Sequence, residues 1–182
     1  MGRDSRRVRA ALVVAGAVVA AGCSGGEAMK PPEPDVAQTI TVTSPAFGDG
    51  QPIPEEHTCR GAGVPPELAW RGVPGEARSL ALVVSDPDAP SGTFMHWVLY
   101  DLPPRDGTLA GGRPPAGARE ADNSGRGKGW YPPCPPSGTH RYVFSVYALR
   151  DRPGGSATQD ILDEIGRTAL ARGTLTGLVA AG

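Results

Sequence analysis

The stretch DPDAPSGTFMHWVLYDLP, residues 86–103, brings two carboxylates and an imidazole close together in sequence. Asp86 and Asp88 lie in a turn framed by prolines, and His96 stands near the start of an apolar, β-branched and aromatic run. A carboxylate beside an imidazole selects the tautomer of the ring and favours its charged form. The pattern predicts that Asp86 orients His96 at the entry of a strand, whereas Asp88 faces away and caps the turn.

A second stretch, THRYVFSVYAL at residues 139–149, begins in a similar way. The alternation of a strand places His140 and Tyr142 on one face, with apolar residues behind them. If the two strands are neighbours, both imidazoles and the phenol lie at one rim of a sheet. The N–H and O–H groups of such a rim are hydrogen-bond donors. The predicted site is therefore a small pocket for an anion or a polar headgroup, formed by Asp86, His96, His140 and Tyr142.

The aromatic residues near these stretches divide into core and loop positions. In MHWVLYD, alternation puts Met95 and Trp97 on the face opposite His96, so Trp97 is assigned to the core. Trp130 and Tyr131 belong to the proline-rich loop GWYPPCPPSG. They are either exposed lips of the pocket or half-buried anchors of the loop, and the sequence leaves both interpretations open.

Two enzymatic alternatives follow from the same residues. The three histidines, His57, His96 and His140, could converge with Asp86 on a zinc ion that activates water. The sequence has no HExxH motif and no close histidine spacing to support this. It also has no GxSxG motif, and Ser91 has no assigned base, so an acid–base dyad would lack a nucleophile. We therefore expect a binding protein without catalytic residues or a bound metal, with a hydrolase as the alternative.

The N-terminus has the composition of a bacterial lipoprotein signal. Residues 1–22 combine four arginines with an apolar run too short to span a bilayer, and small residues precede Cys23. We expect cleavage before Cys23, a lipid on its thiol, and a semi-extended tether over 24–38. An ordinary secretory signal is the alternative. Residues 39–182 would form one domain on the outer side of the cytoplasmic membrane, in the periplasm or at the cell surface.

The charge of the chain argues against nucleic acid as a partner. The formal net charge is −1, and the four arginines and one aspartate of the leader contribute +3, which leaves −4 for the remainder. A mildly acidic body lacks the basic surface that nucleic-acid binding requires. A single lipid would hold the domain at a membrane while the domain itself stays in water.

Cys59 and Cys134 would be the two remaining cysteines of the exported domain. Such a pair favours a disulfide in an oxidising compartment, and two free, buried thiols are the alternative. The bond would close a long loop and add about 4 kcal/mol in the chain-entropy description.

The fold class follows from apolar segments bounded by turn formers, which predict strands at 39–43, 79–85, 95–101, 141–149 and 174–180. One helix is expected over about 156–172. Its N-terminus carries a capping box from Ser156 to Gln159, and Gly173 is expected to stop it. The sequence thus predicts a mostly β, sandwich-like domain with one late helix.

DPDAPSG, the MHW strand entry and PPCPPSGTHRYVFSVYAL together resemble the phosphatidylethanolamine-binding proteins, also called Raf-kinase-inhibitor-like proteins. The bacterial YbhB/YbcL-type branch is the most similar, and TSPAFGDGQPIPEEHTCRGAGVPPELAW resembles its opening, so the resemblance covers residues 39–179. It implies a large antiparallel sheet packed on a smaller one, with an anion-accepting pocket at one edge. It assigns the same four residues to that pocket, with walls from the loop 129–138, and implies a cis peptide at Ala89–Pro90.

The resemblance implies a function in binding, with a small anion or phosphorylated headgroup as the ligand and no cofactor. It also implies a role as an inhibitor-like regulator of a kinase or protease. ATP is not expected beyond the membrane, so a protease or another envelope protein, such as the ectodomain of a kinase, is the expected macromolecular partner.

Overall fold

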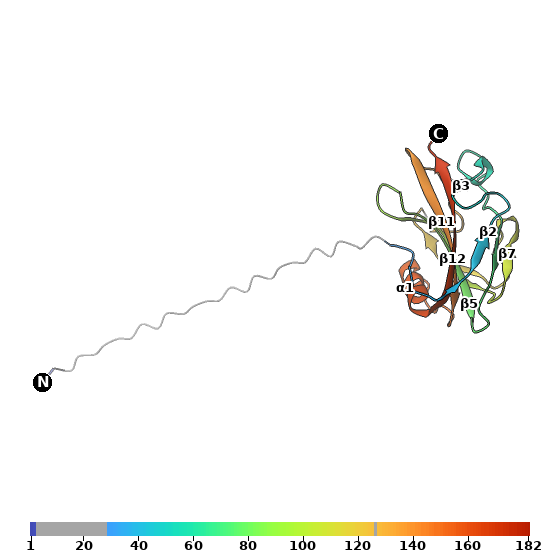
Figure 1. Cartoon of the computed structure of the whole chain (residues 1–182). Coiled ribbons are helices and arrows are strands. Elements are labelled where there is room, and N and C mark those ends of the chain that lie inside the picture. Colours follow the sequence, from blue (N-terminus) through green and yellow to red (C-terminus); the bar gives the residue numbers. More distant parts are fainter. Residues whose placement is uncertain (3–28, 126) are drawn as a thin grey trace.

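The structure is a computed structural model that describes residues 1–2, 29–125 and 127–182 (Figure 1). The predicted signal peptide and Cys23 lie outside these residues, apart from residues 1–2. None of the helices in the described part of the chain has the length and apolarity needed to cross a bilayer.

The large sheet has seven strands in the order β1-β12-β11-β5-β6-β8, with β3 paired to β12. Its four long strands are antiparallel neighbours: β12 Ala169–Ala180, β11 Thr139–Leu149, β5 Ser79–Asp86 and β6 Phe94–Leu102. Three short strands complete it: β8 Arg119–Glu120, antiparallel to β6, and β1 Gln38–Thr39 and β3 Gln51–Pro52, both parallel to β12.

A smaller antiparallel sheet has the order β2-β4-β7, with β2 at Thr41–Thr43, β4 at Leu68–Arg71 and β7 at Gly107–Leu109. A two-stranded ribbon pairs β9 Asp122–Asn123 with β10 Gly127–Lys128. Two single 3₁₀ turns, η1 Glu55–His57 and η2 Ala110–Gly112, lie in the connecting loops. The prediction of a large sheet packed on a smaller one is confirmed.

Both faces of the large sheet are covered, which explains why its central strands are nearly continuous apolar runs. One face packs on the small sheet through a cluster that includes Trp70, Leu82, Trp97 and Phe144. The other face packs on helix α1, Thr158–Thr168, through a cluster that includes Val83, Tyr147 and Ile165. Figure 1 shows the helix and the small sheet on opposite sides of the large one.

The five predicted strands are present, with different limits at the two ends of the chain. The predicted strand 39–43 is divided between two sheets, because Gln38–Thr39 pairs with β12 whereas Thr41–Thr43 pairs with β4. The last strand begins at Ala169 rather than at residue 174, and the predicted stop Gly173 lies inside it.

Helix α1 is shorter than the predicted 156–172. Its N-cap is Ala157, and no side chain caps it, so the expected capping box from Ser156 is wrong. The predicted apolar stripe is buried at Ile161 and Ile165. The helix ends where Ala169 pairs with Leu149 of β11, because sheet pairing outweighs the modest intrinsic preference of the following residues for a helix.

The segment predicted as a tether is in contact with the domain from Met29 onward. Met29 packs against the cluster beneath the helix, and the hydroxyl of Tyr147 donates a hydrogen bond of 2.8 Å to the carbonyl of Pro32. Residues 30–33 therefore run across the face of the large sheet that carries the helix.

Candidate functional site

A cavity of about 320 Å³ lies at the rim of the large sheet where β5 ends and β6 and β11 begin. Its volume is at the lower end of the range for ligand pockets, so it suits a small ligand. The four predicted residues all line it. Its lining consists of Asp86, Ala89, Pro90, Phe94, His96, Tyr131, Cys134, Pro136, His140 and Tyr142.

A β-bulge places His96 in this cavity. Val84 pairs with Trp97 and Ser85 pairs with Met95, so His96 is the extra residue of β6. As a result His96 and Trp97 both approach Trp130, with ring centroids at 6.4 and 5.9 Å. The prediction that Trp97 is a core residue is correct, but the prediction that it lies opposite His96 is wrong, because simple alternation does not hold across a bulge.

The carboxylate of Asp86 pairs with His140 and not with His96, which corrects the prediction from sequence. Nδ1 of His140 donates to Oδ2 of Asp86 at 2.7 Å, and both residues are buried. The other oxygen of Asp86 accepts the backbone N–H of Asp88 at 2.8 Å. Because Nδ1 carries the shared hydrogen, Nε2 is the ring nitrogen of His140 that remains for a ligand.

His96 is oriented instead by the proline-rich loop. Its Nδ1 donates to the backbone oxygen of Tyr131 at 2.6 Å, since a carbonyl can only accept. Burial lowers the pKa of His96, and the Tyr131 carbonyl and the Asp86 charge only partly oppose this effect. At neutral pH the ring is therefore uncharged, and its Nε2 offers a lone pair.

Tyr142 is the third polar group of the cavity. Its ring packs edge-on against His96 with centroids 5.0 Å apart, and its side chain is buried. Burial raises the pKa of Tyr142, and the negative charge of Asp86 adds to the rise. The phenol therefore keeps its hydrogen and acts as a donor at physiological pH.

Asp88 does more than cap the turn. Its carboxylate accepts three hydrogen bonds from Arg141: from the backbone N–H at 2.9 Å, from Nε at 2.9 Å and from a terminal nitrogen at 2.6 Å. The Arg141 side chain lowers the pKa of Asp88 to about 2. The pair fastens the DPDAP turn to the start of β11, which fixes Asp86 beside His140.

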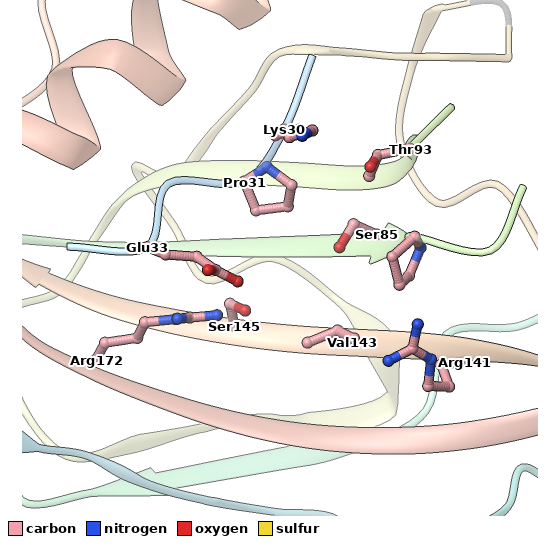
Figure 2. A pocket seen from close by; sticks show the side chains of 10 residues that line it. Lys30, Pro31, Glu33, Ser85, Thr93, Arg141, Val143, Ser145 and Arg172 are labelled. Carbon is pink, nitrogen blue, oxygen red and sulfur yellow. The ribbon is translucent and has the colours of Figure 1, made fainter. Parts of the chain in front are cut away.

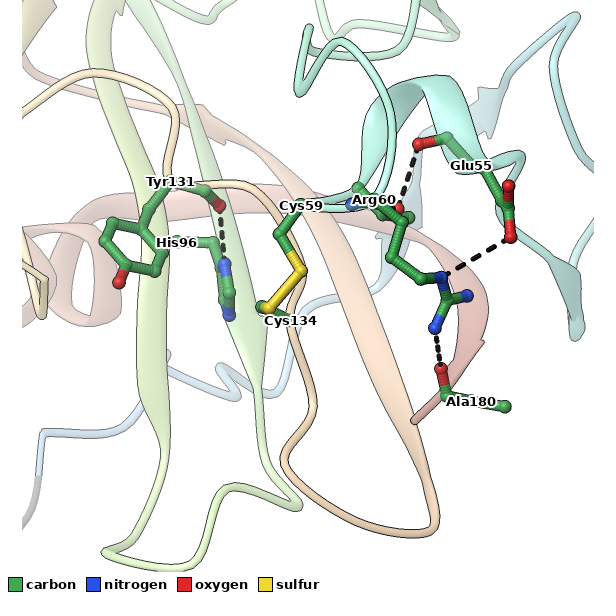
Figure 3. The surroundings of a disulfide bond; sticks show 8 residues. Glu55, Cys59, Arg60, His96, Tyr131, Cys134 and Ala180 are labelled. Carbon is green, nitrogen blue, oxygen red and sulfur yellow. Dashed lines mark hydrogen bonds and ion pairs between the residues drawn. A yellow bond between two sulfur atoms is a disulfide. The ribbon is translucent and has the colours of Figure 1, made fainter. Parts of the chain in front are cut away.

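The predicted disulfide between Cys59 and Cys134 is present, with Cα atoms 5.4 Å apart (Figure 3). It joins the loop that follows η1 to the loop 129–138, and the backbone N–H of Cys59 also donates to the carbonyl of Pro133 at 3.0 Å. Figure 3 shows Tyr131, the hydrogen-bond partner of His96, on the same loop as Cys134. The disulfide therefore holds the cavity wall that orients His96.

His57 does not contribute to this cavity. It lies in η1 with its Nδ1 bonded to the carbonyl of Val64 at 2.9 Å. Within the described ranges, no three side chains of the types that bind metals are arranged to hold an ion, so the convergence of three histidines considered above does not occur. The same residues contain no cis peptide bond, so the expected cis bond at Ala89–Pro90 is wrong.

Aromatic residues that the sequence did not assign form one side of the opening. Phe94 packs on His96 and on Tyr131, with centroids 4.8 and 5.2 Å apart. Each of the two interpretations of the loop aromatics holds for one residue. Trp130 is half-buried against the core, as an anchor of the loop, whereas Tyr131 is 42% exposed, as a lip of the pocket. Phe94 is the first residue of the strand that carries His96, two residues before it, and this position was the available signal for its role.

Comparison with known proteins identifies the family and the fold. The sequence model of the family "Phosphatidylethanolamine-binding protein" matches residues 43–180. A protein of Mycobacterium tuberculosis named as lipoprotein LppC is 44% identical over 129 residues, which are 68% of this chain and 64% of that protein. The chain thus spans slightly less than two thirds of that relative. A UPF0098 protein of Methanothermobacter thermautotrophicus is 42% identical over 151 residues, 79% of this chain and all of that protein.

Two solved structures share the fold. The structure described as a phosphatidylethanolamine-binding protein homologue of Chlamydia trachomatis has a TM-score of 0.74 at 35% identity, covering 80% of this chain and 100% of its own. Escherichia coli YbcL, described as a member of the mammalian PEBP family, has a TM-score of 0.70 at 28% identity, covering 79% of this chain and 99% of its own. The chain belongs to the phosphatidylethanolamine-binding protein family.

Proposed function

We propose that this protein binds a small phosphate-type anion, free or as a phosphorylated headgroup, in the cavity formed by Asp86, His96, His140 and Tyr142. The observation that carries the proposal is that Nδ1 of each imidazole is already bonded, to Asp86 and to the Tyr131 carbonyl. Each ring therefore has Nε2 left for a ligand. The Tyr142 hydroxyl, deeper in the cavity, adds a donor.

The protonation of the cavity suits a phosphate oxygen that carries a hydrogen. Neutral His96 can accept the P–OH hydrogen at Nε2, and Tyr142 can donate to a charged oxygen, while Nε2 of His140 faces the ligand from the other side. The cavity volume of about 320 Å³ admits a headgroup but not a large molecule. Nothing in this arrangement supplies a nucleophile, so binding without catalysis is the function it supports best.

We place the protein in the cell envelope, held by a lipid on Cys23 after cleavage of residues 1–22. Support comes from the lipoprotein name of the mycobacterial relative and from the disulfide, which forms in oxidising compartments. In that location the protein would act as a regulator of an envelope protein, such as a protease or the ectodomain of a kinase, in response to the bound anion.

Thermal unfolding of the full chain in nonionic detergent tests the binding proposal. Phosphate or phosphoethanolamine at about 100 times its dissociation constant should add about 2.7 kcal/mol to the free energy of unfolding. His140→Ala should remove the contribution of this cavity to the stabilisation, whereas His57→Gln, outside the cavity, should keep it. A full response in His140→Ala would refute the assignment, and stabilisation by zinc that a chelator reverses would favour the hydrolase alternative.

A further inference from the structure

A second and larger hollow, of about 620 Å³, lies on the opposite face of the large sheet (Figure 2). Helix α1 covers one part of this face, and residues 30–33 cross another part, which leaves a polar groove between them and the DPDAP turn. We call this the rear groove. It is lined by Lys30, Pro31, Glu33, Ser85, Pro87, Thr93, Arg141, Val143, Ser145 and Arg172.

The rear groove contains polar side chains where a strand buried on both faces would ordinarily be apolar. Ser145 stands in the middle of β11, paired with Val83 on one side and Thr174 on the other, and it is 0% exposed. Its hydroxyl makes no hydrogen bond of good geometry among the described residues, and the nearby Tyr147 hydroxyl, which donates to Pro32, interacts with it only weakly. Ser85, on the neighbouring strand, is 3% exposed and lines the same groove.

An unpartnered buried hydroxyl destabilises a fold, and alanine at the same position would avoid the cost. A serine that faces a hollow can be satisfied by a ligand that enters it. Ser145 therefore points to an occupant that accepts a hydrogen bond.

Arg172 indicates the charge of that occupant. It lies on β12 opposite Tyr147, with its guanidinium 5.7 Å from the centre of that ring, and its buried Nε also has no hydrogen-bond partner among the described residues. In Figure 2 the Arg172 guanidinium and the Ser145 hydroxyl lie together at one end of the groove, below Glu33. Lys30 adds a second cation from the segment that crosses the sheet.

The other charged residues of the lining do not cancel the positive charge of Arg172 and Lys30. Arg141, at the other end of the groove, is held by three hydrogen bonds to Asp88. Glu33 is the one acidic residue of the lining and lies near Arg172, so that Lys30 and Arg172 together exceed it by one positive charge. The hydroxyls of Ser85, Ser145 and Thr93 can all donate, so the groove presents an array of donors of net positive charge.

We infer that the rear groove is a second binding site, separate from the cavity at the rim of the sheet (the rim cavity), and that it holds a small phosphate-type oxyanion at Arg172 and Ser145, with Lys30 as a further cation of the lining. The anion would accept hydrogen bonds from the Ser145 hydroxyl and from Nε of Arg172. The same chemistry is available from a soluble phosphate ester and from the phosphodiester of a lipid headgroup. Lys30 is seven residues from Cys23, a span of at most about 25 Å, so a headgroup would be within reach of an anchored domain.

Nuclear magnetic resonance of the full chain in nonionic detergent can separate the two sites. Inorganic phosphate, added to the His140→Ala variant, should move the amide resonances of Ser145 and Arg172. Arg172→Gln in the same background should abolish the movement, and Arg150→Gln, which removes a charge outside the groove, should preserve it. No movement, or movement that survives Arg172→Gln, would overturn the inference.

Ser145→Ala provides an independent check on the role of the hydroxyl. In the His140→Ala background and without phosphate, its melting temperature should equal or exceed that of the His140→Ala parent, while its affinity for phosphate should fall about five-fold, as expected for one lost hydrogen bond. A lower melting temperature with unchanged phosphate affinity would make Ser145 a structural residue and would contradict the inference.

The source of the anion is decided by two further titrations. Glycerol phosphate should produce the same amide shifts if the ligand is a soluble ester, whereas shifts obtained only with micelles that contain phosphatidylglycerol identify a headgroup. Either result supports the rear groove, provided that Arg172→Gln removes it. Failure of the rim cavity to bind phosphate would leave this result unaffected, because the titrations use the His140→Ala background.

Discussion

Oδ2 of Asp86 lies 2.7 Å from Nδ1 of His140, and this pair, rather than Asp86 with His96, organises the rim cavity. The carboxylate accepts the Nδ1 hydrogen and thereby fixes which nitrogen of His140 faces a ligand. Its other oxygen accepts the N–H of Asp88, so the same residue also shapes the turn. The position of the ligand-facing nitrogen thus depends on one carboxylate.

Asp86→Asn should weaken phosphate binding by about ten-fold or more, the scale of one hydrogen bond to a charged group. The amide can present either its oxygen or its NH₂ group to His140, so the tautomer of the ring is no longer fixed. Isothermal titration calorimetry measures the change. Asp163→Asn is the matched control and should alter the affinity by less than about three-fold, because Asp163 lies on helix α1, outside the cavity, where it accepts a hydrogen bond from Gln159. Equal losses in both variants would contradict the assigned role of Asp86.

The lowered pKa of His96 predicts a pH dependence of anion binding. Sulfate keeps its charge between about pH 5 and pH 8 and has no hydrogen to donate, so it requires the protonated ring. Its affinity should therefore rise as the pH falls across this range. His96→Gln should flatten the profile, whereas His57→Gln should leave it unchanged. A sulfate affinity independent of pH would be incompatible with a neutral His96 in the cavity.

The same shift sets the sign of a stability effect. The folded state holds the pKa of His96 below its unfolded value of about 6.5, so the anion-free protein has its full stability above that pH. As the pH falls below about 6.5, the unfolded chain binds the proton before the folded protein does. The free energy of unfolding therefore decreases until the pH reaches the pKa of His96 in the folded state. Urea unfolding in a buffer without phosphate or sulfate should show this decrease, and His96→Gln should reduce it.

Reduction of the Cys59–Cys134 bond should lower the free energy of unfolding by about 4 kcal/mol, because the bond closes a loop of 75 residues. Phosphate binding should weaken as well, since Cys134 lines the cavity and its loop carries the carbonyl that orients His96. Urea unfolding with and without dithiothreitol measures the first effect. The double variant Cys59→Ser, Cys134→Ser should be insensitive to dithiothreitol; a similar response in that variant would mean that this bond is not responsible.

Gly173 is required by packing rather than by helix termination. A Cβ at this position would stand 1.9 Å from the carbonyl oxygen of Ile40, where the chain passes from the large sheet to the small one. Gly173→Ala should therefore destabilise the fold by several kcal/mol or prevent folding. Gly75→Ala, whose added Cβ meets nothing within 4 Å, should change the stability by less than about 0.5 kcal/mol. Similar unfolding curves for the two variants would refute this account of Gly173.

Residue types and alternation placed the four cavity residues at the ends of long, strongly apolar strands. The two histidine strands are not neighbours, however, because β5 lies between β6 and β11. Residue types and alternation also did not predict the pairing within the cavity. That pairing depends on the bulge at His96, which shifts the register by one residue, and on the loop carbonyl of Tyr131, which has no sequence signature. The Arg141–Asp88 pair was also missed, since it joins residues 53 positions apart.

The helix boundary shows a similar limit of local patterns. Ser156 and Gln159 have the spacing of a capping box, yet Ala157 is the N-cap and Gln159 bonds to Asp163. The end at Thr168 is decided by the pairing of β12 with β11, a contact that local sequence does not encode. The rear groove likewise depends on residues 30–33 folding back over the sheet, whereas their proline-rich composition is typical of a free tether.

The most direct measurement is a long-range proton–nitrogen spectrum of the imidazole rings in the full chain, recorded with and without phosphate. The chain has three histidines, and His57 lies outside the rim cavity and serves as an internal reference. We predict that phosphate shifts the Nε2 resonances of His96 and His140 and leaves those of His57 in place. Unchanged resonances of His96 and His140 at saturating phosphate would contradict the proposal that this cavity binds the anion.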